Sequence, residues 1–332
     1  MRKFLIIILS VFIPGFALPQ YNLDYGIHLG MSNYLGEIGG TGKENKGVSR
    51  RNFIYDIKLN QTKFAGGGWI RYKVHPLISA KANLIYLRIA GADSLSDYPN
   101  RKGRNLSFRN DIFELSVQGE FNFYNAMDIT RGGKIRVDMG AYAFAGIGIF
   151  YHNPKALYET KWVALQPLGT EGQGKIQVPD KKGGMKVLKP YSRIQPNIPM
   201  GVGMMWTIQR KWRFGWEAGL RLTFTDYLDD ASTRYPKDPS IFDDGTEDGQ
   251  LAKALSNRTP ADFYQVLDDG KILTSGQYGS GALRGEPKHD DMYMFVGINA
   301  GYVVRGKGNF YRMQYKFRTG VKKRKRRTRA KF

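Results

Sequence analysis

The stretch GGTGKEN, Gly39 to Asn45, is the part of this sequence that comes closest to a phosphate-binding loop. That chemistry needs the pattern G-x-x-x-x-G-K-[ST], in which backbone amides surround a phosphate and the final hydroxyl binds Mg²⁺. A match ending after Lys43 would require glycine at position 37 and serine or threonine at position 44. The chain has Glu37 and Glu44 there, so we interpret the stretch as a flexible outer loop without nucleotide chemistry.

The four histidines are spread too widely along the chain to suggest a metal site. None belongs to an H-E-x-x-H motif, and no pair has the spacing of zinc ligands. We expect His28 in a barrel lumen, His75 in a turn, and His152 and His289 at strand ends. No Ser-His-Asp set can be identified. We therefore predict that the protein is not an enzyme and has no catalytic, cofactor-binding or metal-binding residues.

An acidic segment in the second half of the chain could bind calcium through its carboxylates. The calcium-loop pattern D-x-[DN]-x-[DN]-G is absent from it, so we favour a solvated surface loop. In the same region, Gln250 to Arg258 has the pattern of a short helix whose outer face could contact a partner. The acidic residues are Asp226, Asp229, Asp230, Asp238, Asp243, Asp244, Glu247 and Asp248.

The strongest chemical signal is the basic tail, which holds thirteen Lys/Arg residues and no acid between positions 305 and 332. The whole chain has a formal net charge of +22. In a cytosolic protein such a run would suggest nuclear import or nucleic acid. In an exported protein the available anions are acidic protein surfaces, cell-wall polymer and lipid headgroups. A solvated charge run without a partner is the alternative. The candidate partner-binding residues are Lys322, Lys323, Arg324, Lys325, Arg326, Arg327, Arg329 and Lys331.

The N-terminal residues predict export, which removes the nucleic-acid interpretation of the tail. Arg2 and Lys3 precede an apolar run from Phe4 to Phe16, and small residues at Gly15 and Ala17 suit a signal peptidase. The run is too short for a membrane anchor, which takes roughly 20 apolar residues. The chain has no cysteine, so disulfides and a lipidated N-terminal cysteine are excluded. We predict a signal peptide over residues 1–20.

The elements that must position these groups are strands, because apolar and polar residues alternate with period two. The clearest run, Trp212 to Tyr227, alternates over fourteen positions without an error, which is long for a soluble strand of five or six residues. Its apolar face is Trp212, Phe214, Trp216, Ala218, Leu220, Leu222 and Phe224; its polar face is Arg213, Gly215, Glu217, Gly219, Arg221, Thr223 and Thr225.

Eight such runs can be found, and the lengths of the gaps between them alternate strictly. Short gaps fall at 75–76, 125–133 and 209–211, and long gaps at 37–63, 92–110, 153–196 and 228–289. Outer-membrane barrels have this organisation, with tight periplasmic turns, long outer loops and an even number of strands. Inside lipid every backbone group must be paired, and only a closed sheet achieves this with strands.

We therefore predict an all-β fold, an eight-stranded antiparallel transmembrane β-barrel with long extracellular loops and a basic periplasmic C-terminal tail. A soluble exported β-sandwich or barrel is the alternative. Eight strands leave a lumen only wide enough for side chains, so we expect an anchor rather than a pore. The predicted lumen charges are Asp24, Glu114, Glu120, Arg136, Asp138, Arg213, Glu217 and Arg221.

The predicted barrel spans residues 21–304 and the tail 305–332. Asn309 to Phe317 also alternates, and it could be a ninth strand or a short periplasmic strand after the barrel. We favour the second, because a ninth strand would break the even count and put the tail outside the cell. Both ends of the mature chain are then expected in the periplasm.

Three segments are similar to the PorG family, outer-membrane barrels of the type IX secretion system of Bacteroidetes. They are YNLDYGIHLGMSNYLGEIGG (Tyr21 to Gly40), FIYDIKLNQTKFAGGGWIRYKV (Phe53 to Val74) and LAKALSNRT (Leu251 to Thr259). Together they cover about a fifth of the chain. The first segment is the most specific of the three.

The resemblance implies a non-enzymatic anchor subunit that ties a periplasmic, lipoprotein-containing ring to the outer membrane, beside the translocon. That machinery exports proteins, including adhesins for gliding motility in motile species. The implied partners are the ring lipoprotein, its partner subunit, the translocon and outer-membrane lipid. The alternatives are a small barrel that tethers the envelope to the cell wall through its tail, or a small channel or lipid-modifying enzyme.

Overall fold

The computed structural model describes residues 22–39, 59–96, 98–130, 134–179, 185–267, 271–287 and 289–305. Eight long strands dominate it, and all eight match runs predicted from the sequence. They are β1 (Asn22–Leu35), β2 (Lys63–Lys73), β3 (Ile78–Ala92), β4 (Ser107–Ala126), β5 (Val137–Tyr158), β9 (Ile194–Ile208), β10 (Trp212–Thr223) and β13 (Met292–Arg305).

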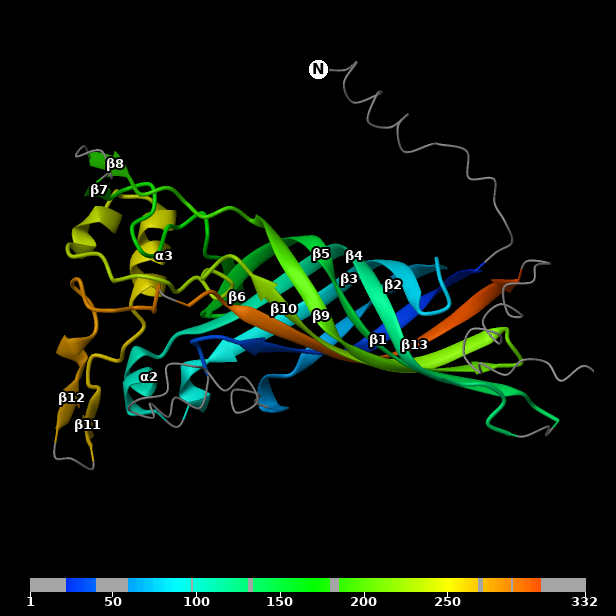
Figure 1. Cartoon of the computed structure of the whole chain (residues 1–332). Coiled ribbons are helices and arrows are strands. Elements are labelled where there is room, and N and C mark those ends of the chain that lie inside the picture. Colours follow the sequence, from blue (N-terminus) through cyan, green and yellow to red (C-terminus); the bar gives the residue numbers. More distant parts are fainter. Residues whose placement is uncertain are drawn as a thin grey trace, which may run out of the picture.

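These strands close into one antiparallel barrel (Figure 1). The order around it is β4, β3, β2, β1, β13, β10, β9 and β5, and pairing of β5 with β4 closes the circle. The first and last barrel strands pair along their whole length, from Asn22 with Arg305 to Leu35 with Met292. The predicted eight-stranded antiparallel barrel is therefore confirmed.

The outer face of the barrel is apolar and the inner face is polar, as the alternation predicts. On β10 every residue of the polar set is buried from Arg213 to Thr223, while Trp212, Phe214 and Trp216 are exposed. Ile147, on β5, is 74 % exposed. Such an inside-out distribution would be unfavourable in water, because a soluble monomer rarely exposes a contiguous apolar patch of this extent. It matches the lipid-facing band of a membrane barrel.

All the short connections lie at one end of the barrel, the turn end, together with the start of β1 and the end of β13 (Figure 1). The connection between β9 and β10 is tight, with Gln209 and Arg210 both at positive φ and a Lys211 N–H bond to the Ile208 carbonyl of 3.0 Å. The strand ends that the four long connections join lie at the opposite end, the long-loop end. The short and long gaps that alternate in the sequence therefore correspond to connections at opposite ends of the barrel.

The long connections contain folded elements of their own, gathered at the long-loop end (Figure 1). Helix α3 (Glu247–Ser256) confirms the short helix expected in this region; the Thr246 hydroxyl caps it by accepting from the Gly249 amide at 3.0 Å. The other elements are η1 (Leu59–Gln61), η2 (Asp93–Leu95), α2 (Pro99–Arg104), β6 (Lys161–Ala164), β7 (Gln177–Pro179), β8 (Met185–Val187), η3 (Pro239–Phe242), β11 (Tyr264–Val266), β12 (Ile272–Thr274) and η4 (Ser275–Gln277).

Two apolar clusters hold this end of the molecule together. In one, Leu228 and Ala231 of the loop after β10 are fully buried among inward-facing barrel residues such as Ile85 and Phe295. In the other, Leu255 of α3 packs with Leu165 and neighbouring residues of the loop after β5. The loops therefore form a folded cap over the barrel. The first cluster fills the barrel lumen at the long-loop end.

No helix among the described residues is long and apolar enough to span a membrane. Several predicted features lie outside the described residues. These are the signal peptide, nearly all of the GGTGKEN stretch, the alternating segment 309–317 and the candidate partner-binding residues 322–331.

Candidate functional site: the filled lumen and its two ends

Paired charges fill the lumen from its centre to the turn end. Six of the eight predicted lumen charges lie inside the lumen. Asp24, Glu114, Glu120, Arg213, Glu217 and Arg221 are each at most 6 % exposed. All six stand on the inward-facing positions of their strands, which is where the period-two alternation places them.

The other two predicted charges lie at the margin of the lumen. Arg136 precedes β5 by one residue and bonds Asp138 at 3.0 Å through its Nε. The side chains are 30 % and 19 % exposed, respectively. Asp138 also accepts from the Asp128 amide at 2.9 Å, so this pair organises the β4–β5 turn rather than plugging the barrel.

Lys81 on β3 meets Glu217 on β10 at 2.5 Å, and both side chains are fully buried. In the strand order, three strands separate β3 from β10 in either direction. The pair therefore spans the full width of the lumen. The hydroxyl of Tyr142, from β5, donates to the same Glu217 carboxylate at 3.0 Å, which gives the buried charge a further donor.

A second bridge crosses the lumen nearer the long-loop end. Tyr293 on β13 donates to Glu114 on β4 at 2.7 Å, and these two strands are also diametrically opposite. The Asn197 amide donates to Glu114 at 3.0 Å and Arg221 lies 3.4 Å from it. The Ser116 hydroxyl also donates to it at 3.1 Å, so Glu114 is held by one cation and three neutral donors.

Toward the turn end, two arginines complete the network. Arg71 donates to Glu120 at 2.8 Å through Nη2, and its Nε lies 2.7 Å from the other carboxylate oxygen. Arg213 bonds Asp24. On the described strands the buried acids are Asp24, Glu114, Glu120 and Glu217, and the buried Lys/Arg residues are Arg71, Lys81, Arg213 and Arg221. The lumen charges therefore balance, which is the condition under which buried ions are tolerated.

Arg71 and Lys81 were not among the predicted lumen charges. Both lie in the two least regular of the eight runs, where a glycine triplet and small residues blur the alternation. A requirement for charge balance could have found them, because the six predicted charges that lie in the lumen are four acids and only two bases.

Inward-facing glycines make room for aromatic rings beside this network. A Cβ at Gly203 would lie 2.5 Å from Cζ of Tyr142, and one at Gly219 would lie 2.7 Å from Cζ of Phe144. Gly203 and Gly219, on the polar faces of their strands, therefore leave space for the rings of Tyr142 and Phe144. Aromatic rings and paired charges together fill the lumen.

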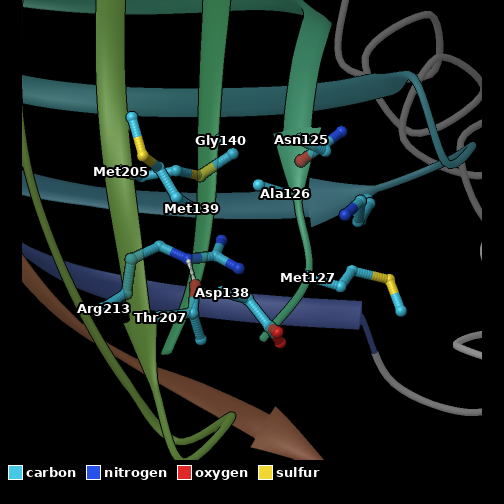
Figure 2. Close-up of a pocket in the computed structure, with 10 residues that line it drawn as sticks. Asn125, Ala126, Met127, Asp138, Met139, Gly140, Met205, Thr207 and Arg213 are labelled. Atoms are coloured by element: carbon cyan, nitrogen blue, oxygen red, sulfur yellow. Dashed lines mark hydrogen bonds between the residues drawn. The ribbon is translucent and has the colours of Figure 1, made fainter. Parts of the chain in front are cut away.

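The turn end of the lumen retains a small cavity of about 40 Å³ (Figure 2). Figure 2 shows Arg213 of β10 beside Thr207 of β9, to which its Nε donates at 3.2 Å, with Met205 on β9 and Met139 on the next strand, β5. A buried water needs roughly 10–15 Å³ on this measure, so the cavity holds a few waters at most.

At the long-loop end, three of the acids expected in a solvated loop are buried, and that expectation was wrong for them. Asp226, Asp229 and Asp230 are 7 %, 1 % and 0 % exposed. Asp229 and Asp230 are buried because partners from distant segments meet them, whereas Asp238 and Asp243 further along the loop are exposed as expected. Among the described residues, no group of three or more His, Asp or Glu side chains is arranged to hold a metal ion.

Arg284 is the cation around which this cap is built. It lies 3.2 Å from Glu171 and 3.4 Å from Asp230, and donates to the Ser256 carbonyl at 3.1 Å. Asp230 also accepts from Thr170 and Tyr191. Burial raises the pKa of Asp230 to about 6, although the Arg284 guanidinium opposes the rise.

Tyr34 joins two carboxyls at the mouth of the barrel. Its hydroxyl lies 2.6 Å from Oδ2 of Asp229 and 2.6 Å from Oδ1 of Asp291. One hydroxyl proton can serve only one acceptor, so the other carboxyl carries a proton and donates to the tyrosine oxygen. Burial, reinforced by the nearby carboxylates of Asp229 and Asp226, raises the pKa of Asp291 well above its ordinary value.

A closed sheet, an apolar outer face and a lumen blocked by paired charges define a small, side-chain-filled β-barrel of the outer-membrane type. Within that class, residues 2–164, just under half of the chain, match a family model described as "Domain of unknown function (DUF6089)". A search of curated proteins gives no match.

Two solved barrels are similar in fold. The N-terminal β-barrel domain of Pseudomonas aeruginosa OprF is 7 % identical, with 85 % of this chain and 99 % of that chain covered and a TM-score of 0.29. Ail, the attachment invasion locus protein of Yersinia pestis, solved with the heparin analogue sucrose octasulfate, is 10 % identical. The match covers 85 % of this chain and 98 % of that chain, with a TM-score of 0.28. Similarity at this level supports no inference about function.

Proposed function

We propose that this protein is a non-enzymatic anchor subunit of a type IX secretion machinery in the outer membrane. In this role it ties a periplasmic, lipoprotein-containing ring to the membrane and the translocon. The observation that carries the proposal is the blocked lumen. Lys81 and Glu217 meet across its full width, so the barrel offers a fixed position in the membrane rather than a path through it.

The positions of the barrel ends support the same role. β1 begins and β13 ends at the turn end, and short turns face the periplasm in outer-membrane barrels. In this orientation the basic tail leaves the barrel on the periplasmic side. Its many cations would contact acidic surfaces of ring subunits through charge pairs that are individually weak and collectively orienting.

The choice of the type IX secretion machinery rests on the N-terminal similarity to PorG-type barrels. The family match over residues 2–164 covers the same part of the chain. The test is affinity purification of the tagged protein from gently solubilised membranes, together with deletion of the gene. We expect ring proteins to co-purify and secretion to fail on deletion. Purification of the barrel alone, with normal secretion in the deletion strain, would refute the role.

The role of the tail is tested by a variant in which the eight Lys and Arg residues between positions 322 and 331 are changed to glutamine. A matched control changes exposed cap lysines such as Lys253. We expect only the tail variant to lose the ring proteins. If instead it retains them but no longer binds purified cell-wall sacculi, the tail is a cell-wall tether.

A further inference from the structure

We propose that the outer rim of β3, β4, β5 and β6 at the long-loop end binds the phosphate groups of a phosphorylated glycolipid of the outer leaflet. The inference rests on the orientation given under the proposed function, which places the long loops outside. It does not depend on the role in secretion.

The first observation is a pair of like charges on the lipid-facing side. Arg109 of β4 and Lys155 of β5 are direct cross-strand partners. Both occupy outward positions, because Arg109 alternates with buried Phe108 and Asn110, and Lys155 with buried Pro154 and Ala156. Like charges directly opposite each other in a sheet are destabilising, so this arrangement is favourable only when an anion joins them.

The second observation is that the one neighbouring acid, Asp111, only partly offsets the charge of the pair. Asp111 accepts from Arg88 at 2.6 Å and from the Tyr86 hydroxyl at 2.8 Å. Among the described residues, no carboxylate lies within ion-pair distance of Arg109 or Lys155. Three cations on this outward face thus share one carboxylate.

A fourth cation lies at the edge of the same surface. Arg258, from the loop after α3, donates to the Ser107 hydroxyl at 2.7 Å, and Ser107 is two residues from Arg109 on the same face of β4. Burial alone lowers the pKa of Arg258, which agrees with the lack of a carboxylate beside it. The net charge of the four cations and Asp111 is +3.

The guanidinium of Arg109 is already oriented. Its Cζ lies 4.1 Å from the ring centroid of Trp162 on β6, and Trp162 pairs in register with Leu157 of β5 on the outward side. A stacked guanidinium keeps its N–H groups directed sideways in a planar fork, which is the geometry that binds phosphate through two hydrogen bonds.

The position of this cationic patch relative to the apolar band favours a lipid headgroup over a soluble anion as the ligand. Along β4 the outward residues run from Val117 through Leu115 to Phe113, all more than half exposed, and then to Asp111 and Arg109. Four residues of strand span about 13 Å at most, so Arg109 lies just beyond the apolar band. Tyr86, Phe113, Tyr151 and Trp162 form the aromatic girdle beside it.

The test compares thermal unfolding of the purified barrel in neutral detergent with and without three lipids: diphosphorylated lipid A, dephosphorylated lipid A and phosphatidylglycerol. The variant is Arg109→Gln with Lys155→Gln. The matched control is Lys134→Gln with Lys211→Gln, which removes two exposed cations at the turn end.

We expect diphosphorylated lipid A to raise the unfolding temperature of the native protein and the control, and its apparent affinity to fall about tenfold or more in the variant. Without lipid, Lys155→Gln alone should be no less stable than the native protein, because it removes the like-charge repulsion and keeps the stacking of Arg109 on Trp162. Equal losses in variant and control, or equal binding of phosphatidylglycerol or dephosphorylated lipid A, would overturn the proposal.

If the double variant does not fold, Lys155→Gln alone is compared by the same measurements, since Arg109 then keeps its stacking on Trp162. Failure of lipid binding would leave co-purification with the secretion ring unaffected. The two proposals can therefore fail separately.

Discussion

Lys81 and Glu217, from diametrically opposite strands, form an ion pair of 2.5 Å across the centre of the barrel. The contact is possible because eight strands make a lumen no wider than two long side chains. It cross-links opposite walls of the barrel and blocks the lumen at the same point.

Removal of one partner of this pair should be far more harmful than removal of both. Lys81→Met leaves Glu217 buried without its nearest cation, and we expect a loss of about 3–5 kcal/mol in the free energy of unfolding. The double variant Lys81→Met, Glu217→Gln should recover most of that loss. Urea unfolding followed by the heat-dependent gel shift measures both.

The matched control for that cycle is Lys253→Met. Lys253 pairs with Asp243 at 2.7 Å, but both side chains are about half exposed, so a change of about 0–1 kcal/mol is expected. Equal effects of Lys81→Met and Lys253→Met would mean that the lumen pair is open to water.

The barrel should not conduct ions in planar bilayers. Opening the central layer by Lys81→Ser with Glu217→Ser should still leave it closed, because the bridge between Tyr293 and Glu114 and the buried Leu228 form a separate block above it. A steady open level from the native protein would contradict this account. Current from the double variant but not from the native protein would show that the Tyr293–Glu114 bridge and Leu228 do not close the lumen by themselves.

The cap should become more stable on mild acidification. The pKa of Asp230 is about 6 in the folded protein against an ordinary value of 3.8. The folded state therefore binds the proton more readily, and stability falls as pH rises from about 4 to about 6, by about 3 kcal/mol at most. Asp229 and Asp291, whose pKa values are also raised, act in the same direction.

The measurement is hydrogen exchange of the loop after β10 at pH 5 and pH 7.5. We expect larger protection factors, which are exchange rates corrected for the intrinsic pH dependence of amide exchange, at pH 5 than at pH 7.5, and a smaller difference between the two pH values in Asp230→Asn. Larger protection factors at pH 7.5 in the native protein would reverse the sign and refute the burial argument.

The glycine at position 203 should tolerate no side chain. Gly203→Ala brings a Cβ to 2.5 Å from the Tyr142 ring and 2.9 Å from the Trp216 carbonyl, and such overpacking typically costs about 1–3 kcal/mol. Gly68→Ala is the control, since its Cβ would have no neighbour closer than 3.7 Å. We expect the control to be neutral or slightly stabilising, as alanine loses less backbone entropy than glycine. Equal loss in both variants would show that the Tyr142 contact is not what limits position 203.

The sequence by itself determined the closed barrel, because two local patterns specify it. Alternation over runs such as Trp212 to Thr223 assigns each side chain to one face of a strand. The strict succession of short and long gaps then places neighbouring strands antiparallel. Both signals are local along the chain, so they can be read without knowing which distant residues meet.

Only the tertiary structure decided which charges pair and which loop acids are buried. Lys81 and Glu217 are 136 residues apart, and their contact depends on the order and stagger of strands around the circle. Asp230 is buried because Arg284, from a distant part of its own loop, and Thr170 and Tyr191, from the loop between β5 and β9, meet around it. A carboxylate in a solvated loop and one in a packed cap have the same sequence signature, and the difference arises only when the loops fold against each other.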